Sequence, residues 1–222
     1  MSRSGASARV APADGGGHAG LGKRQRNVIR NRQSILSAAR EVFSELGYGA
    51  ATIRDIVRRT DLAAGTFYNY FPDKESVLRE ILEDFTGRVR QRAHEARMEA
   101  RTLEELMRSS FLTCFRLYAE EKTLVAMMAR NAGEVPLMTS GTILQPAIAE
   151  LIADLRAKER EGVVPRLDIE RTARVAVALA SELGLHMLSR KPLDIEGTTE
   201  FAARFMLGGI IGVAGAPLAK GA

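Results

Sequence analysis

The chain has few of the residues that build covalent or metal-bound cores. Its 222 residues include one cysteine, Cys114, and three histidines, which excludes an internal disulfide framework and a multi-cysteine zinc site. Tryptophan is absent. The longest uncharged apolar run, residues 205–219, is interrupted by glycines and a proline and is shorter than the ~20 residues of a membrane-spanning helix. We therefore expect a globular cytoplasmic protein that needs no metal and no cofactor.

Acidic residues are nearly missing from the start of the chain. Residues 1–33 carry seven basic residues against one acidic residue, whereas the rest carries 25 basic and 26 acidic residues. The excess positive charge therefore lies in residues 1–22, which we expect to form a disordered basic arm, and at Lys23, Arg24 and Arg26, where the first helix begins. Such a segment suits a polyanionic partner, either nucleic acid or an anionic membrane surface.

Strand patterns are also absent, because no stretch alternates between apolar and polar residues with period two. Helical periodicity recurs along the chain and predicts an all-α fold of about nine helices. Near the N-terminus, Thr52 is a good N-cap for a short helix, and a second short helix covers about residues 64–70. Pro72 ends that helix, and Asp73 is the expected N-cap of a long helix that continues into the 90s.

Aromatic residues are scarce but concentrated. Four of the twelve, Phe67, Tyr68, Tyr70 and Phe71, fall within five positions. Phe67 and Phe71 are four residues apart, so they share one helix face and can anchor it in a small core. The two tyrosines point elsewhere, where they can contact phosphates and sugars. Two short helices joined by a tight turn, with this division of aromatics, indicate a helix-turn-helix.

The segments "RQSILSAAREVFSELGY", "ATIRDIV" and "GTFYNYFPDKESVL" resemble the DNA-binding domain of the TetR/AcrR family of transcriptional regulators, over residues 27–80. The resemblance implies a three-helix DNA-binding domain at residues 23–74. It also implies a larger helical domain at residues 75–222, which binds a small effector and forms a homodimer through the last two helices. It further implies repression of a palindromic double-stranded DNA operator, with release when the effector binds.

The resemblance also implies the residues that contact DNA: Thr52, Arg54, Ala64, Gly65, Thr66, Tyr68, Asn69, Tyr70 and Lys74, with Lys23, Arg24 and Arg26 from the basic segment. Two positions depart from the family pattern. Asp61 stands where the turn usually has glycine, and we expect it to adopt the left-handed conformation that aspartate tolerates. Ala63 stands where the recognition helix usually has a hydroxyl N-cap, so this helix must depend on tertiary packing.

Apolar and methionine-rich faces in the second half of the chain predict either an effector cavity or ordinary core packing. The expected cavity lining is Met107, Phe111, Phe115, Tyr118, Met127, Met128, Arg130, Leu144, Ile148, Leu183, His186 and Met187. Few of these residues are polar, which favours a lipophilic effector. Cys114 lies on the same apolar face and is expected to be a buried, unreactive thiol.

No nucleophile–base pair, phosphate-binding loop or metal-ligand cluster is recognisable, so we do not expect an enzyme. The glycine-rich "LGGIIGVAG" suits a close approach between helices at a dimer interface. A two-fold dimer would place two recognition helices ~34 Å apart, about one DNA turn, or at a wider spacing if two dimers share an operator. The alternative is a basic helical protein that binds anionic membranes or polyanions without sequence preference.

Overall fold

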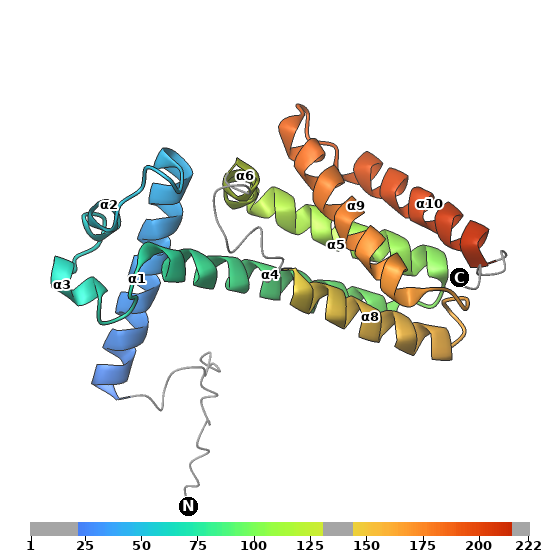
Figure 1. Cartoon of the computed structure of the whole chain (residues 1–222), viewed down its shortest axis with the longest axis horizontal. Helices are drawn as coiled ribbons and strands as arrows, with labels where there is room; N and C mark the ends of the chain where they lie inside the picture. Colours follow the sequence, from blue (N-terminus) through green and yellow to red (C-terminus); the bar gives the residue numbers. More distant parts are fainter. Residues whose placement is uncertain (1–21, 131–143, 215–222) are drawn as a thin grey trace, which may run out of the picture.

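The computed structural model describes residues 22–130 and 144–214 and, within these ranges, contains nine helices and no strand (Figure 1). The prediction of an all-α fold is therefore confirmed. The helices are α1 (Lys23–Leu46), α2 (Ile53–Val57), α3 (Ala64–Phe67), α4 (Lys74–Glu99), α5 (Leu103–Glu120), α6 (Lys122–Arg130), α8 (Gln145–Arg160), α9 (Ile169–Ser189) and α10 (Ile195–Ala214). The predicted basic arm, residues 1–22, lies outside the described residues except for its last residue.

The predicted caps fix where two N-terminal helices begin. The Thr52 hydroxyl accepts a hydrogen bond from the Asp55 amide at 3.2 Å, and the Asp55 carboxylate accepts one from the Thr52 amide at 3.0 Å. At the start of α4, the Asp73 carboxylate accepts a hydrogen bond from the Ser76 amide at 2.7 Å. Each cap satisfies amides that the helix itself leaves without partners, which stabilises a helix by about 1 kcal/mol.

A first hydrophobic core joins α1, α2 and α3 to the N-terminal half of α4 and to α6, at the left of Figure 1. Its largest fully buried side chains are Ile35, Phe43, Ile56, Phe67, Phe71, Leu78, Ile81, Leu82 and Met127. Together they hold α3, a helix of only one turn, against three longer or better-capped neighbours. Because Leu124, Val125 and Met127 belong to this core, α6 packs on α1, and it also contacts α5 and α9.

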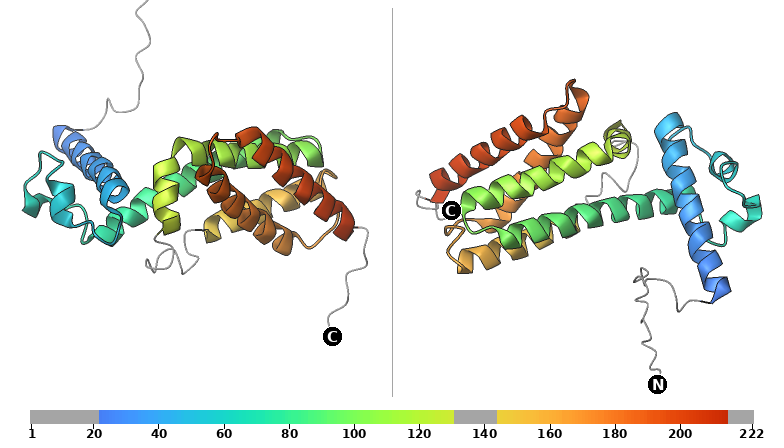
Figure 2. Two further views of the ribbon diagram at one scale, coloured as in Figure 1. Left: turned by 90° about the horizontal axis from the view of Figure 1, so that it is seen from above. Right: turned by 180° about the vertical axis from the view of Figure 1, so that it is seen from behind.

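A second hydrophobic core lies among α5, α8, α9 and α10, and α10 packs along α5 (Figure 2). Its buried members include Leu106, Phe111, Phe115, Leu155, Ala173, Met187, Ala202 and Met206. Helix α4 passes from one core to the other, because Val77–Phe85 lie in the first core and its C-terminal half packs on α5 and α8. The domain boundary expected at residues 74 and 75 stays a prediction.

Charged side chains join the two cores where α1, α4 and the end of α5 meet. Arg40 on α1 lies 3.0 Å from Asp84 on α4 and 3.3 Å from Glu121, which caps α5. Arg88 on α4 approaches the same two carboxylates, at 3.4 Å and 2.5 Å. We call these four residues the junction cluster. Each contacts two others, so the cluster connects three helices through one network.

Candidate nucleic-acid interface and ligand cavity

The face that α3 turns to its neighbours is aromatic. Phe67 is 0% exposed and Phe71 is 2% exposed, and their ring centroids lie 6.0 Å apart. The same short segment leaves Ala64, Gly65 and Asn69 exposed. The predicted division of this segment into a buried side and an exposed side is therefore present, with small residues at the exposed start of the helix.

Arg32 on α1 holds the end of this segment, a role that the sequence pattern did not reveal. Its Nη1 donates a hydrogen bond to the Tyr70 carbonyl at 3.2 Å, and its Nε donates to Glu80 of α4 at 2.8 Å. Its guanidinium carbon also lies 4.4 Å from the centroid of the Phe71 ring, within the range of a cation–π contact. Arg32 therefore fixes α3 between α1 and α4. No local motif signals this contact, because its partners lie 38 and 48 residues away in the chain.

The two tyrosines of the cluster differ. Tyr68 is 60% exposed, with its ring edge against Phe67. Tyr70 is half-buried, and its hydroxyl oxygen accepts a hydrogen bond from the Asn31 side chain at 3.1 Å. That arrangement leaves the Tyr70 hydroxyl proton available for an external acceptor. Both tyrosines can therefore donate to a phosphate, although only Tyr68 projects fully from the surface.

The turn between α2 and α3 closes differently from the expectation for Asp61. Among the described residues, only glycines have a positive φ, so Asp61 does not adopt the left-handed conformation. The Thr60 amide and hydroxyl both donate to the Val57 carbonyl at 2.9 Å, and the Thr60 hydroxyl accepts from the Leu62 amide at 3.2 Å. The hydrogen bonds of Thr60 therefore close this turn without a residue in the left-handed conformation. Ala63 precedes α3 without a capping side chain, as expected.

Lys74 has partners within the chain. Its ammonium group donates to the carbonyls of Tyr48 at 2.8 Å, Gly49 at 3.3 Å and Ala51 at 2.8 Å, and it lies 4.5 Å from the centroid of the Tyr48 ring. These three bonds use its three protons and fix the α1–α2 turn. A phosphate contact from Lys74 would replace one of them, so that contact stays a prediction.

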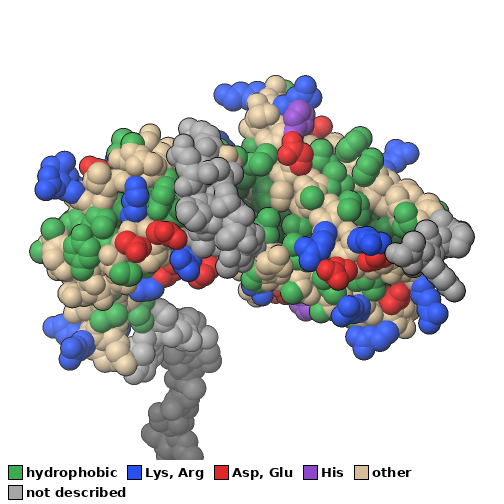
Figure 3. Space-filling model, viewed as in Figure 1, with side chains coloured by type: hydrophobic (Ala, Val, Ile, Leu, Met, Phe, Trp, Pro, Cys, Tyr) green, Lys and Arg blue, Asp and Glu red, His purple; other side chains and the backbone are tan. Residues whose placement is uncertain are grey.

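The other predicted DNA contacts lie on the same end of the molecule. Thr66 is half-buried, and the remaining side chains are exposed on the starts of α1 and α2: Lys23, Arg24, Arg26, Thr52 and Arg54. In Figure 3, Lys and Arg side chains lie at the left-hand end of the surface, over α1–α3. The candidate nucleic-acid interface therefore combines the exposed face of α3 with basic and capping residues of two neighbouring helices.

An elongated cavity lies among α4, α5, α8, α9 and α10, and the volume open to the centres of water molecules is about 120 Å³. Four predicted effector-binding residues line it: Met107, Phe111, Tyr118 and Leu144. Most of the other lining residues are apolar, including Phe85, Val89, Ala93, Cys114, Leu151, Leu155, Ala176, Val177, Ala180 and Met206. The cavity is therefore suited to an apolar molecule.

The remaining predicted lining residues lie elsewhere, which corrects the sequence-based set. Phe115 and Met187 are buried in the second core, and Leu183 packs against it. Met127 belongs to the first core and Met128 packs against it. The half-buried Ile148 of α8 does not line the cavity, and the side chain of Arg130 lies outside the described residues.

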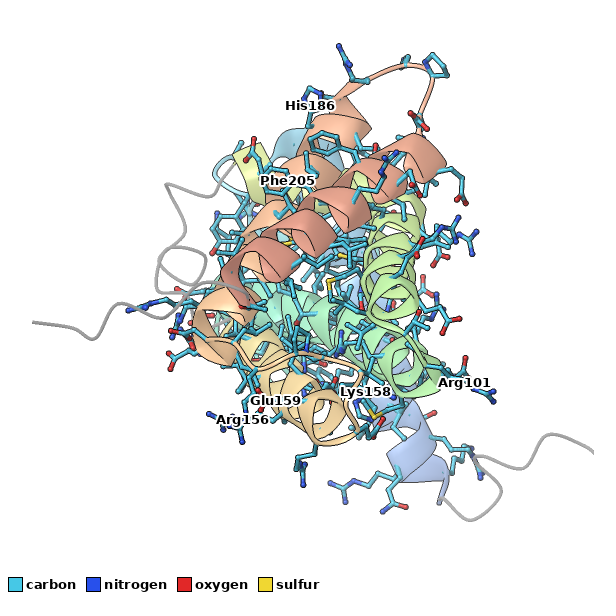
Figure 4. All side chains as sticks on the ribbon, turned by 90° about the vertical axis from the view of Figure 1, so that its right-hand side faces the viewer. Arg101, Arg156, Lys158, Glu159, His186 and Phe205 are labelled. Carbon is cyan, nitrogen blue, oxygen red and sulfur yellow. The ribbon has the colours of Figure 1, made fainter. Side chains whose placement is uncertain are left out.

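The prediction that His186 lines the cavity is also wrong, because this residue is exposed near the end of α9 (Figure 4). The larger omission from the prediction is α4, which supplies Phe85, Thr86, Val89, Arg90, Ala93 and Arg97. The charged sequence of this helix resembles that of a solvated face. Phe85, Val89 and Ala93 recur every four residues, and this apolar spacing is the sequence signal that α4 has a buried face beyond Phe85.

Most polar side chains at the cavity already have partners. The hydroxyl groups of Thr86, Ser110 and Ser181 donate to helix carbonyls at 2.6–2.9 Å. Arg90 donates to Glu150 of α8 at 2.6 Å. Burial raises the pKa of the Cys114 thiol to about 12, and it also raises the pKa of the Tyr118 hydroxyl. Both groups are therefore protonated and neutral near pH 7.

A second apolar surface lies on the outside of α10 (Figures 3 and 4). Phe201 is 58% exposed and Phe205 is 59% exposed, and their rings stack with centroids 6.1 Å apart. The same side of the helix continues through Gly208, Gly209 and Gly212, where an added Cβ would meet no atom within 4 Å. These glycines leave the helix backbone open to a neighbouring molecule, as expected for a close helix–helix contact.

Two further properties concern the described residues alone. No described helix is long and apolar enough to cross a membrane. Nor does the described part of the chain bring together three or more His, Cys, Asp or Glu residues in an arrangement that could hold a metal ion.

Comparison with known proteins identifies the N-terminal region. Residues 35–81 match the sequence profile of the bacterial regulatory proteins of the tetR family. This range contains the second half of α1, all of α2 and α3, and the start of α4. The HTH-type transcriptional regulator UidR of Escherichia coli strain K12 is 24% identical over 182 residues, which cover 81% of this chain and 92% of UidR.

Solved structures extend the likeness of fold to the C-terminal helices. FadR from Bacillus subtilis, in complex with stearoyl-CoA, superposes with a TM-score of 0.70 and 22% identity over 80% of this chain and 98% of FadR. The fatty acid degradation regulator FadR from Bacillus halodurans has a TM-score of 0.69 and 22% identity over 81% of this chain and 95% of its own. Both comparisons cover the N-terminal helices together with the helical bundle.

Proposed function

The chain belongs to the TetR family of DNA-binding transcriptional regulators, and we propose that it is a repressor that a small lipophilic effector releases from a palindromic operator. The observation that carries this proposal is the pair of faces on the α3 segment. Phe67 and Phe71 bury one face, and the other exposes small and polar residues at the start of the helix. A helix with small exposed residues at its start suits close approach to the major groove.

Contacts to the DNA fall into two groups in this proposal. Thr66 in α3 and Asn69 just after it are the side chains best suited to base edges, because their short polar groups can donate and accept hydrogen bonds. Tyr68, Thr52 and the basic start of α1 supply contacts to phosphates, which set position and salt dependence. Arg32 keeps the two groups in register, since it ties the end of the α3 segment to α1 and α4.

The apolar stripe on α10 supports a homodimer. Phe201, Phe205 and the three glycines form a continuous surface on one side of the helix, and large exposed aromatic pairs are uncommon on a monomer. The same stripe on a second copy would be complementary under two-fold symmetry, which is the commonest symmetry of homodimers. We propose that α10, with the adjoining part of α9, forms this interface.

The cavity supports a lipophilic effector. Its walls are formed mainly by aliphatic and aromatic side chains, and the hydroxyl groups at its surface donate to helix carbonyls. FadR from Bacillus subtilis, whose structure contains stearoyl-CoA, has the same fold. We propose a molecule with a substantial apolar body as the effector of this chain.

Helix α4 provides the route from effector to DNA. Phe85 lines the cavity, lies with its ring centroid 5.9 Å from that of Tyr118, and also belongs to the first core, which holds α3. Asp84, which directly precedes Phe85, and Arg88, about one turn further along α4, belong to the junction cluster with α1 and the end of α5. A ligand that displaces α4 therefore moves groups that position the recognition helix. Such a ligand binds one position of α4 better than the other, and this difference in affinity couples effector binding to DNA binding.

The direct test is selection of DNA from a random pool by the purified protein at near-physiological salt, with the bound sequences read out. The proposal predicts an enriched inverted repeat with half-sites about one turn, or ~34 Å, apart. Salt-sensitive binding without enrichment would contradict it. That outcome would favour a protein that binds polyanions or anionic membranes without sequence preference, which vesicle binding would then test.

A further inference from the structure

Among the described residues that line the cavity, one is both charged and buried. Arg97, near the end of α4, has only 7% of its side chain exposed, whereas Arg90 on the same wall is 38% exposed and paired with Glu150. Arg97 lies twelve residues after Phe85 on the same helix, which corresponds to ~18 Å along its axis. The charged group therefore marks one end of an elongated cavity, and the Phe85–Tyr118 pair marks the other.

The geometry of Arg97 leaves part of its guanidinium group unused. Its Nε and Nη2 atoms both lie 2.7 Å from Oδ2 of Asp154 on α8. The other carboxylate oxygen, Oδ1, lies 2.8 Å from Nδ1 of His94. Within the described part of the chain, no hydrogen bond involves Nη1 of Arg97. The guanidinium is thus held in place on one side while its remaining N–H groups have no acceptor.

Two observations place the Arg97 side chain beside the cavity. Arg97 is among the cavity-lining residues even though it is almost fully buried. Its positive charge also acts on the Cys114 thiol, another lining group, and opposes the rise of the thiol pKa that burial causes. Nη1 is not fully shielded from solvent, whereas Asp154 holds the rest of the guanidinium group. A ligand atom that accepts from Nη1 therefore replaces water with a hydrogen bond to a charged group, which is stronger than one between neutral groups.

The charge balance at this point selects the kind of acceptor. Asp154 is itself buried and already neutralises Arg97, with both of its oxygens occupied. A ligand carboxylate or phosphate at Nη1 would lie close to the Asp154 carboxylate in a medium of low dielectric constant, where like charges repel strongly. An uncharged carbonyl, ester or thioester oxygen accepts the same hydrogen bond without that repulsion.

We propose that Arg97, held by Asp154, is the polar anchor of the effector site, and that the effector is an apolar molecule carrying an uncharged hydrogen-bond acceptor at one end. This inference rests on the proposed function and names the chemical class of its effector. The acceptor lies at Arg97, and the apolar body extends along α4 towards Phe85 and Tyr118. The body of the ligand then reaches the part of α4 that belongs to both hydrophobic cores.

The test uses the full-length protein and two matched sets of probes. One set has an aromatic body (ethylbenzene, acetophenone and benzoate) and the other a linear body (octane, 2-octanone and octanoate). Binding is followed by methyl NMR of protein labelled at the methionine methyl groups. Met107 and Met206 line the cavity, whereas Met127 lies in the first core, so the signals report both the affinity and the place of binding.

In the wild-type protein we expect each ketone to bind about 10- to 100-fold more tightly than its hydrocarbon and its carboxylate, as a hydrogen bond to a charged group implies. The double variant Arg97→Met, Asp154→Leu should reduce the ketone preference to less than about threefold. Replacing both partners avoids leaving one buried charge, so this variant is expected to fold. The matched control is Arg92→Met, Glu120→Leu, which removes an exposed ion pair between α4 and α5 and should keep the preference.

A third variant tests the charge argument. Asp154→Asn keeps the guanidinium and removes the opposing charge, so benzoate and octanoate should bind at least about tenfold more tightly than in the wild type. Equal affinity for ketone and hydrocarbon, or tightest binding of the carboxylates in the wild type, would overturn this inference and leave the lipophilic effector intact. If no probe of either set shifts Met107 or Met206, the lipophilic effector and this inference both fall.

Discussion

The N-terminal and C-terminal regions present their functional groups in opposite ways. In the N-terminal region, one short segment carries both the buried anchor, Phe67 and Phe71, and exposed residues that we propose contact DNA. In the C-terminal region, five helices from residue 85 to residue 206 contribute to one cavity, and its buried charge comes from a helix that also belongs to the first core. The first site is local in sequence, and the second exists only after the helices assemble.

This difference has a physical basis. A recognition helix must be exposed, so its pattern of buried and exposed positions is visible in a few adjacent residues. A cavity is a gap in packing among long-range neighbours, and the residues that line it have the same composition as a core. Substitutions that affect one region and leave the other unchanged test this difference.

The largest effect is expected from Phe67→Ala. Removing a fully buried aromatic side chain typically costs about 3–5 kcal/mol, and α3 has a single turn and no capping side chain to compensate. The variant should lose DNA binding, and hydrogen exchange should show loss of protection in α1–α3 with protection retained in α5 and α10. In Phe115→Ala, which removes an equally buried ring, the loss should fall in the C-terminal helices instead. Unchanged protection of α1–α3 in Phe67→Ala would show that α3 does not depend on this anchor.

A second large effect is expected from Phe205→Glu on the α10 stripe. Each chain of the dimer would place a charge at the proposed interface, so the dimer dissociation constant should rise at least ~30-fold. This factor corresponds to about 2 kcal/mol, the loss expected when one important interface residue is removed. Analytical ultracentrifugation measures this change. Leu46→Glu, at an exposed apolar site at the end of α1, is the control and should leave the dimer unchanged. A dimer of normal affinity in Phe205→Glu would place the interface elsewhere.

A moderate effect is expected from Tyr68→Phe. This change removes one exposed hydroxyl group, so the affinity for DNA should fall about 3- to 10-fold for every DNA sequence. The free energy of unfolding should stay unchanged. Fluorescence anisotropy with two unrelated duplexes measures it. Tyr118→Phe removes the corresponding hydroxyl at the cavity and should leave DNA affinity unchanged when no effector is present. A loss confined to one duplex would mean that Tyr68 reads bases and does not contact the backbone.

An effect confined to alkaline pH is expected from Cys114. Burial raises the pKa of its thiol to about 12, so the folded state binds the proton more tightly than the unfolded state does. This stabilisation is complete below the ordinary value of 9.0 and is lost as the pH rises towards 12. Between pH 9 and pH 11 the wild type should therefore lose more unfolding free energy than Cys114→Ala, by at most ~1.4 kcal/mol per pH unit. Parallel pH profiles in chemical denaturation would contradict the burial argument.

Periodicity, hydroxyl or carboxylate caps and the Phe67–Phe71 spacing are local signals. From them the sequence predicted the helices, the caps of α2 and α4, and the two faces of the segment around α3. It did not predict Arg32, whose partners are brought close only by packing. It placed Met127 and Met128 at the cavity because apolar side chains alone do not show which core a helix joins. It also omitted Arg97, since a buried arginine and a solvated arginine look alike in a charged run.

The most direct measurement compares DNA selection by the wild type and two variants at one ionic strength. Thr66→Ala, Asn69→Ala changes the half-buried Thr66 of α3 and the exposed Asn69 that follows it. Lys23→Gln, Arg24→Gln, Arg26→Gln removes three charges from the start of α1. The α3 variant should enrich a different or relaxed sequence, whereas the α1 variant should enrich the wild-type sequence with weaker, less salt-dependent binding. If the α3 variant enriches the same sequence as the wild type, the exposed face of α3 does not read the operator, and the account is contradicted.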